Sequence, residues 1–311
     1  MGAAELNVKG RVAVLLGPTA VGKTAVALML AQGVGAEIVG ADSLQVYREL
    51  NIGTAKPTRE ERARVPHHLL DVVPPMEPYD AARYSRDARS VLARLHQRGV
   101  ASLVVGGTGL YLKALLYGLF SEGSPAGGVR ERLRYELDGV GLSSLYQRLA
   151  RLDPPSAGRL HPHDTYRILR ALEVIEATGR PVSDLIAAHR FRDCPYEVLK
   201  LGLALPREEL NRRIEARVET MLAQGWLQEV EGLLKHYPPE LKPLQAIGYR
   251  HLVNFLTGRW SWEEALELLK RDTRRYAKRQ LTWFRADPEV RWFHPAQVEE
   301  MGEALRDFFK N

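Results

Sequence analysis

One octapeptide near the amino terminus constrains the fold of this chain more than any other feature of the sequence. Residues 17–24, GPTAVGKT, match the phosphate-binding pattern G-x-x-x-x-G-K-[ST] at every fixed position. An apolar run at residues 12–16 comes just before the pattern, and a helical pattern at residues 24–32 follows it. This context predicts a buried strand, a loop that wraps an anionic oxygen, and a helix whose amino terminus faces that anion.

Short apolar runs alternate with helical patterns through the first 120 residues. The run at 12–16 is followed by runs at 38–41 and 101–105, and residues 79–98 carry apolar side chains three and four positions apart. Strands that are apolar throughout and alternate with helices are typical of a parallel sheet with helices on both faces. The fold class predicted is therefore α/β, with a P-loop NTPase-like parallel sheet as its core.

The character of the sequence changes near residue 121. Residues 121–128 form a turn-rich stretch of mainly Gly and Ser, with one Pro. Polar helical patterns then continue to about residue 192, and an apolar run at 199–205 resumes the α/β alternation. We expect an α/β core made of residues 1–120 and 199–311, ending in long C-terminal helices, and a helical insertion domain at residues 121–198.

The net charge and the cysteine content of the chain limit which partners it can bind and in which cellular compartment it can work. The chain has 44 Lys and Arg against 38 Asp and Glu, and a net charge of +6 permits a polyanionic partner without proving one. The single cysteine, Cys194, cannot form an internal disulfide, which favours a reducing compartment such as the cytoplasm. No apolar run approaches the roughly 18–20 residues of a membrane span. Since no apolar interface stripe is evident either, we expect a monomer that does not enter a membrane.

The loop residues have defined tasks in phosphate binding. Backbone N–H groups wrap the anionic oxygens, Lys23 supplies a full positive charge, and the Thr24 hydroxyl binds Mg²⁺. The predicted phosphate-binding residues are Gly17, Pro18, Thr19, Ala20, Val21, Gly22, Lys23 and Thr24.

The loop by itself fits a nucleotide kinase or a nucleoside triphosphatase. A triphosphatase would carry Asp at the end of the strand at 101–105, but this run ends in Gly106 and Gly107. The only acid that closes an apolar run is Asp42, which places it at the carboxyl edge of the sheet beside the loop. Asp42 could bind Mg²⁺ through water, serve as a base, or only cap a turn.

Further segments closely resemble the bacterial tRNA dimethylallyltransferase (IPP transferase) family. They are DSLQVY at 42–47, IGTAKP at 52–57, PHHLLD at 66–71, GGTGLY at 106–111, RILRALE at 167–173, QAIGYR at 245–250 and KRQLTWFR at 278–285. Together with the phosphate loop, the resemblance covers roughly residues 11–293, and no motif is missing.

The resemblance implies a specific activity. Members of the family transfer a dimethylallyl group from dimethylallyl diphosphate to N6 of adenosine 37, just 3′ of the anticodon, in tRNAs that read codons starting with U. The product is N6-(dimethylallyl)adenosine, and diphosphate is released. The implied fold is a P-loop α/β core with a helical insertion domain that contacts the anticodon stem, and the implied cofactor is Mg²⁺.

The resemblance also assigns residues to the two substrates. Arg217 and Ser43 join the loop in binding the diphosphate, and Lys23, Thr24 and Arg217 act in catalysis by meeting the charge on the leaving group. Asp42 is the candidate general base toward N6.

Basic and aromatic residues near the carboxyl terminus extend the expected tRNA contact. Residues 270–285 contain seven Lys or Arg and one acid, with Tyr276 and Trp283 interleaved. Such a run is ordinarily a solvated face, and it is the resemblance that favours phosphate contacts here. The full set of predicted tRNA-binding residues is Asp42, Ser43, Leu44, Gln45, Thr108, Arg130, Tyr166, Arg167, Ile168, Leu169, Arg170, Gln245, Gly248, Tyr249, Arg250, Arg275, Lys278, Arg279, Gln280, Trp283 and Arg285.

Two other classes of function stay open on the sequence. One is a small-molecule P-loop enzyme, such as a nucleotide kinase or an adenylate (AMP) prenyltransferase. The insertion and the basic helix count against it, because a free nucleotide needs neither. The other is a P-loop RNA-binding protein without chemistry, and the combination of Lys23, Thr24 and Asp42 counts against that.

Overall fold

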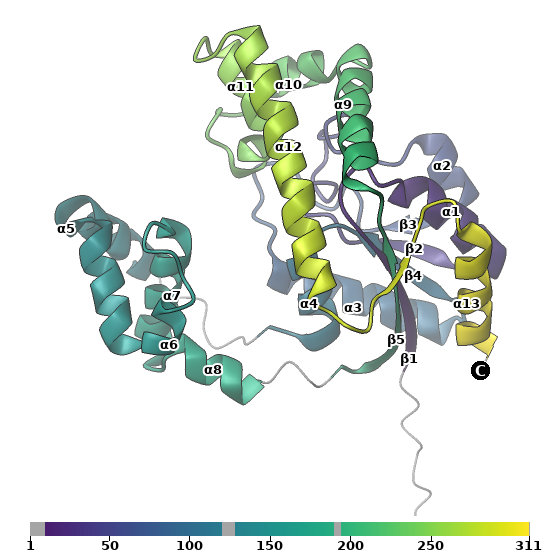
Figure 1. Ribbon diagram of the computed structural model, residues 1–311, viewed down its shortest axis with the longest axis horizontal. Helices are drawn as coiled ribbons and strands as arrows, with labels where there is room; N and C mark the ends of the chain where they lie inside the picture. The colour runs from purple at the N-terminus through teal and green to yellow at the C-terminus, as the bar shows by residue number, and fades with distance from the viewer. Residues whose placement is uncertain (1–9, 120–127, 190–193, 311) are drawn as a thin grey trace, which may run out of the picture. The chain divides into compact units, whose positions relative to one another are not determined.

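The computed structural model describes residues 10–119, 128–189 and 194–310 (Figure 1). These residues fall into two compact units, each described by itself. The core unit comprises Met1–Leu116 and Pro195–Asn311, and the insertion unit is Tyr117–Cys194. The boundaries expected from the sequence, 121 and 198, fall a few residues later at both ends.

Six parallel strands form one sheet in the core unit, in the order β3-β2-β4-β1-β5-β6. The strands are β1 (Gly10–Leu16), β2 (Glu37–Gly40), β3 (His67–His68), β4 (Ser102–Gly106), β5 (Tyr196–Leu203) and β6 (Arg291–Phe293). The inner strand β1 pairs with β4 on one side and β5 on the other, so that Leu16 lies opposite Gly106 and Gly202. Because all the strands are parallel, the loops that follow β1, β2 and β4 leave the same edge of the sheet.

Helices cover both faces of the sheet, which confirms the predicted α/β class. Helices α1 (Lys23–Val34) and α13 (Val298–Lys310) pack in one buried cluster with Ala13, Leu15 and Leu201. Side chains alternate along a strand, so the fully buried Val12 and Val14 face the other side. There α3 (Ala81–Gln97) contacts β2 and β4.

A layer of helices after β5 stands over the carboxyl edge of the sheet. It consists of α9 (Arg207–Ala223), α10 (Trp226–Leu234), the 3₁₀ helix η1 (Lys242–Gln245), α11 (Tyr249–Leu256) and α12 (Trp262–Arg285). Figure 1 shows α9 and α12 side by side, leading from this edge to α10 and α11. Ile214 of α9 and Ala277 of α12 belong to the buried cluster of the sheet, which fixes both helices beside the phosphate loop. Two shorter helices, α2 (Arg59–Arg64) and α4 (Gly109–Tyr117), complete the core unit.

The insertion unit is entirely helical in the residues described. Its helices are α5 (Val129–Leu152), α6 (Pro154–Ala157), α7 (Thr165–Thr178) and α8 (Val182–His189). Gly141 has a positive φ of 76° inside α5, so this element consists of two helices joined at a kink. Leu133, Leu149 and Leu172 are fully buried and form a core of the unit's own. Within the described part of the chain, no helix is both long and apolar enough to cross a membrane.

Candidate active site

The loop between β1 and α1 has a backbone that glycine makes possible. Gly17, Ala20 and Gly22 have φ values of 153°, 63° and 103°. A Cβ on Gly17 would lie 2.8 Å from the carbonyl oxygen of Leu203, so a larger residue does not fit. Helix α1 begins at Lys23, and no described side chain caps its first N–H groups. These donors are therefore left for an anion.

Lys23 lies within this loop. Its Nζ donates hydrogen bonds to the carbonyl oxygens of Gly17 (3.0 Å) and Pro18 (2.7 Å). Burial and the nearby guanidinium of Arg217 lower the pKa of Lys23 to about 7, while the carboxylate of Asp42 acts in the opposite direction. An anion bound in the loop would favour the charged form of this lysine.

Asp42 follows β2, and its two carboxylate oxygens differ. Oδ1 accepts the backbone N–H groups of Leu44 (2.8 Å) and Gln45 (3.3 Å), the turn cap considered from the sequence. Among the described residues, Oδ2 has no hydrogen-bond partner. The adjoining Ser43 N–H donates to Thr108 Oγ1 (3.1 Å), which ties the ends of β2 and β4 together. The cap therefore orients Asp42 and leaves one oxygen for a ligand.

Arg217 reaches the same site from α9. It forms no hydrogen bond or ion pair with any described residue, although its charge acts on Lys23. Burial lowers the pKa of Arg217, and the Asp42 carboxylate partly offsets this effect. The structure thus brings together Lys23, Asp42 and Arg217, which lie on three separate segments of the sequence.

Tyr276 of α12 belongs to the site and was not among the predicted site residues. It lies close to Thr108, and burial together with the charge of Asp42 raises the pKa of Tyr276 to about 12. The sequence could have indicated this role. Tyr276 and Gln280 are four positions apart and therefore lie on the same face of the helix.

Gln280, predicted to bind tRNA, is instead bonded within the protein. Its Oε1 accepts the N–H of Thr19 (2.9 Å), and its Nε2 donates to the carbonyl oxygen of Gly107 (2.8 Å). The residue is 7% exposed. A Cβ on Gly107 would come within 2.4 Å of that nitrogen. Gln280 therefore holds the phosphate loop against the end of β4.

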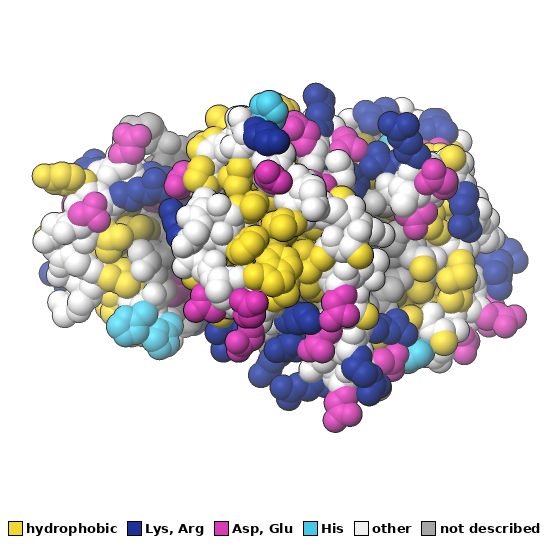
Figure 2. Space-filling model, turned by 90° about the horizontal axis from the view of Figure 1, so that it is seen from above, with side chains coloured by type: hydrophobic (Ala, Val, Ile, Leu, Met, Phe, Trp, Pro, Cys, Tyr) yellow, Lys and Arg dark blue, Asp and Glu magenta, His cyan; other side chains and the backbone are white. Residues whose placement is uncertain are grey.

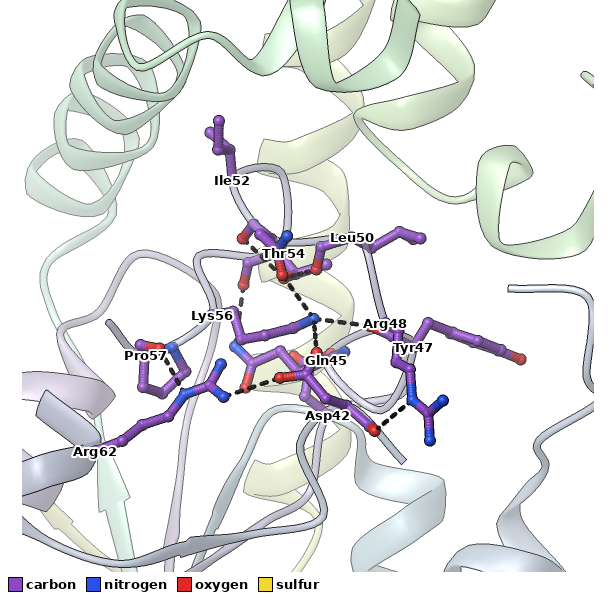
Figure 3. A network of polar contacts seen from close by, with 12 residues as sticks. Asp42, Gln45, Tyr47, Arg48, Leu50, Ile52, Thr54, Lys56, Pro57 and Arg62 are labelled. Carbon is purple, nitrogen blue, oxygen red and sulfur yellow. Dashed lines mark hydrogen bonds and ion pairs between the residues drawn. The ribbon is translucent and has the colours of Figure 1, made fainter. Parts of the chain in front are cut away.

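Several other predicted tRNA contacts also turn inward. The Gln45 amide donates to the carbonyl oxygens of Thr54 (3.0 Å) and Ala55 (3.3 Å) (Figure 3). Tyr249 is fully buried, and Gly248 is packed so closely that a Cβ would lie 2.4 Å from Trp226. Gly248 and Tyr249 are therefore closed to an RNA, whereas Gln45 is only half-buried and its amide is engaged in shaping the loop. Leu44 is half-buried, whereas Gln245 is exposed and its amide donates to the carbonyl oxygen of Pro239 (2.6 Å).

The basic residues of α12 divide into paired and open groups. Arg271 and Arg250 pair with Asp272, and Arg274 pairs with Glu215 of α9 (2.7 Å). The exposed members of the predicted set are Arg275, Lys278, Arg279, Trp283 and Arg285, with Arg275 at 3.9 Å from Asp272 and Arg279 over the ring of Tyr276. On the core unit's face in Figure 2, Lys and Arg side chains are interspersed with Asp and Glu. The surface available to phosphates is therefore smaller than the charge count suggests.

In the insertion unit, Tyr166 and Arg167 are exposed on α7, with Tyr166 at 77%. Their neighbour Ile168 is fully buried in the unit's core, and Leu169 packs against that core. The prediction that Ile168 contacts tRNA is therefore wrong for its side chain.

Arg130 and Arg170 of the insertion unit share one acidic partner. Both bond to Glu173, which is 4% exposed, through contacts of 2.7 Å and 3.1 Å from Arg130 and 3.0 Å from Arg170. Their guanidinium groups are thus anchored, and each remains partly exposed.

The donors near the loop suit a hard cation. The hydroxyls of Thr24 and Ser43 and the free oxygen of Asp42 lie on segments that leave the same sheet edge. Mg²⁺ prefers oxygen ligands, retains several waters and is held largely by substrate phosphates. Among the described residues, no group of three His, Cys, Asp or Glu side chains could hold a metal by itself. The residues present fit Mg²⁺ bound together with a diphosphate.

Two family models match this chain. "IPP transferase" matches residues 45–287, and "Isopentenyl transferase" matches residues 10–71. A tRNA dimethylallyltransferase of Syntrophobacter fumaroxidans is 54% identical over 288 residues, which cover 92% of this chain and 84% of the relative. The tRNA dimethylallyltransferase of Desulfatibacillum aliphaticivorans is 50% identical over 303 residues, which cover 97% of this chain and 99% of the relative.

Solved structures agree with these matches. The full-length tRNA isopentenylpyrophosphate transferase of Bacillus halodurans has a TM-score of 0.72 and 36% identity, with 97% of each chain covered. A eukaryotic dimethylallyltransferase acting on tRNA has a TM-score of 0.81 and 29% identity, covering 96% of this chain and 77% of that one. This chain therefore belongs to the IPP transferase family, that of the tRNA dimethylallyltransferases.

Proposed function

We propose that this chain transfers a dimethylallyl group from dimethylallyl diphosphate to N6 of adenosine 37 in tRNAs that read codons starting with U. The observation that carries the proposal is the grouping of Lys23, Asp42 and Arg217 at one sheet edge, with no partner for Arg217 among the described residues. A cation without a partner beside a phosphate loop supports a ligand with several negative charges. The relatives named above are called after this reaction.

The donor half of the reaction needs charge stabilisation. The bond between C1 of the dimethylallyl group and the diphosphate oxygen breaks, and its electron pair leaves with the diphosphate. The N–H groups at the start of α1, Lys23 and Arg217 meet that charge as it grows. Mg²⁺, which Thr24 would hold, would add positive charge beside the diphosphate, and Ser43 is a further oxygen donor for the metal or the diphosphate.

The acceptor half needs a base, because the N6 amine of adenine is a weak nucleophile. As N6 forms its bond to C1, it gives up a proton, and the free oxygen of Asp42 accepts it. The same oxygen accepts a hydrogen bond from N6–H. Guanine has an oxygen at the equivalent position, so this contact favours adenine.

The target base is stacked in the anticodon loop and has to leave the stack to reach Asp42, at a cost of about a few kcal/mol. The exposed residues of α12, and Tyr166 and Arg167 of the insertion, offer phosphate and stacking contacts that stabilise such a complex. We also propose that the enzyme acts as a monomer, which gel filtration at assay concentrations would test.

The test is one incubation with three arms. The protein is mixed with Mg²⁺, dimethylallyl diphosphate and an unmodified anticodon stem-loop, and the mass of the RNA is measured. The second arm offers AMP as acceptor, and the third offers ATP as donor. We expect one dimethylallyl group on the RNA, none on AMP and no phosphate transfer from ATP.

A stem-loop with guanosine at position 37 is the matched control and should gain no mass. Phosphate transfer from ATP without alkylation of the RNA would indicate that the protein is a kinase, and it would overturn the proposal.

A further inference from the structure

A single carboxylate from α10 gathers four hydrogen-bond donors. Oε2 of Glu229 accepts the backbone N–H groups of Asn51 (2.9 Å) and Ile52 (2.7 Å). Oε1 accepts the N–H of Gly53 (3.2 Å) and the hydroxyl of Tyr249 (2.7 Å). Three of the donors belong to the chain between β2 and α2, and the fourth belongs to α11.

Only a carboxylate can serve all four donors. Each oxygen accepts two hydrogen bonds, which is within its capacity. The amide of glutamine offers one oxygen and one NH₂, so two donors would face another donor. The contact is therefore specific to a carboxylate.

The segment that Glu229 holds is braced internally and against residues 71–73. Residues 42–57 run from Asp42 through a network in which Lys56 Nζ donates to the Tyr47 carbonyl oxygen (2.7 Å), Asn51 Oδ1 (3.0 Å) and Asp71 (2.7 Å) (Figure 3). Thr54 Oγ1 donates to the carbonyl oxygen of Leu50 (2.8 Å). Backbone bonds also join Arg48 N–H to the carbonyl oxygen of Val73 (2.8 Å) and Val72 N–H to that of Val46 (2.7 Å). Glu229 is what attaches this braced segment to helix α10.

The anchoring surface is tightly packed. A Cβ on Gly53 would lie 2.0 Å from Nε1 of Trp226, so the segment meets α10 at its backbone. Trp226 packs edge-on against Tyr249, with ring centroids 5.8 Å apart. Burial and the Glu229 carboxylate raise the pKa of Tyr249, and the charge of Asp42 adds to this rise. Asp42 therefore lies within electrostatic reach of the cluster that Glu229 organises.

We propose that Glu229 is a positioning residue for the acceptor half of the reaction. It fixes residues 42–57 against α10 and α11, and thereby fixes the direction in which Asp42 faces the target amine. In the proposed function the diphosphate is met mainly by Lys23 of α1 and Arg217 of α9, neither of which bonds to Glu229, and Ser43 is the one diphosphate residue within 42–57. This inference rests on the proposed function, and it assigns Glu229 chiefly to the acceptor substrate.

The first test is Glu229→Gln in the full chain, with Glu231→Gln as its control. Glu231 lies on the same helix, is exposed, and makes no contact of this kind with the described residues. With saturating stem-loop and dimethylallyl diphosphate, we expect the single-turnover rate of Glu229→Gln to fall about 10²-fold, the scale of a misplacement near 1 Å. The Kd for pyrophosphate should stay at the wild-type value. The binding stoichiometry is the control for folding, because a loss of folded protein would lower it.

A second measurement keeps this inference separate from the proposed function. Hydrogen exchange of the amides at 51–53 should become at least tenfold faster in Glu229→Gln, and unchanged in Glu231→Gln. Unchanged exchange, a wild-type turnover rate, or an equal loss of pyrophosphate binding would each overturn the positioning role. Absence of transfer by the wild type would overturn the proposed function instead. If Glu229→Gln does not fold, Glu229→Asp, which keeps both oxygens and shortens their reach, gives the same comparison.

Discussion

The geometry of Asp42 allows both tasks that the sequence offered as alternatives, a turn cap and a general base. Its Oδ1 caps the turn after β2, and its Oδ2 has no bond among the described residues. A turn cap and a base are therefore compatible in one side chain, because the cap sets the direction of the remaining oxygen.

Asp42→Asn should separate these tasks. The Asn carbonyl oxygen can still accept the Leu44 N–H, but the amide cannot take a proton. We expect stem-loop binding within about twofold of wild type and a turnover loss of about 10²–10⁴-fold, measured by filter binding and single-turnover alkylation. Asp138→Asn, on the exposed surface of the insertion, is the control. Weakened RNA binding at an unchanged single-turnover rate would show that Asp42 is not the base.

Lys23 predicts a pH dependence of diphosphate binding. Its pKa of about 7 means that it loses its proton as the pH rises above this value, whereas the bound anion favours the ammonium. Binding above pH 7 must therefore take up a proton, and affinity should weaken by up to about tenfold per pH unit.

Calorimetry of pyrophosphate binding, in buffers of different ionisation enthalpy at pH 6 and pH 8, measures that proton. Lys23→Arg stays charged at both pH values and reports the protons that belong to pyrophosphate alone. Equal uptake by the two proteins at pH 8 would contradict the prediction.

Glu173 joins α5 and α7, the two long helices of the insertion. It is buried on α7 and bonded to Arg130 of α5 and Arg170 of its own helix. Glu173→Gln turns one buried acceptor oxygen into an NH₂ group that faces partly exposed guanidinium donors, and we expect it to destabilise the insertion by about 1–3 kcal/mol. Hydrogen exchange across residues 129–178 would report the loss. The exposed Glu131→Gln should leave the exchange unchanged, and equal rates in both variants would remove Glu173 from this role.

Helix α12 carries the cations that remain open to an RNA. Replacing Arg275 and Lys278 with Gln should reduce the slope of log Kobs against log salt by about 1–2. The double variant Arg306→Gln and Lys310→Gln removes the same charge from α13 and should leave the slope near the wild-type value. If both pairs change the slope equally, the net charge of the protein controls binding and α12 has no special part in it.

For the whole molecule, periodicity predicted the fold well because buried parallel strands are apolar throughout. The inward face of α7 was also legible, since Ile168 and Leu172 are four positions apart and mark a buried stripe. The family motif led us to predict that Ile168 binds tRNA together with the exposed Arg167. The four-residue spacing of Ile168 and Leu172 indicates instead that Ile168 is buried.

The contacts that complete the site were beyond such reasoning. Gln280 bonds to Thr19 and Gly107, which are 261 and 173 residues away. Glu229 bonds to Ile52 across 177 residues. The spacing of residues along the chain cannot predict partners this far apart in the sequence. Only the folded structure shows that both side chains point into the protein.

The pairing of β1 with β5 also sets the order in which a growing chain can complete its sheet. Arg11 and Glu197, which form an ion pair across these strands, are 186 residues apart. The insertion unit lies within this interval and has its own core, so its collapse shortens the loop that has to close. Until β5 leaves the ribosome, one edge of β1 stays unpaired in the nascent chain, and that edge is where a chaperone would prevent aggregation.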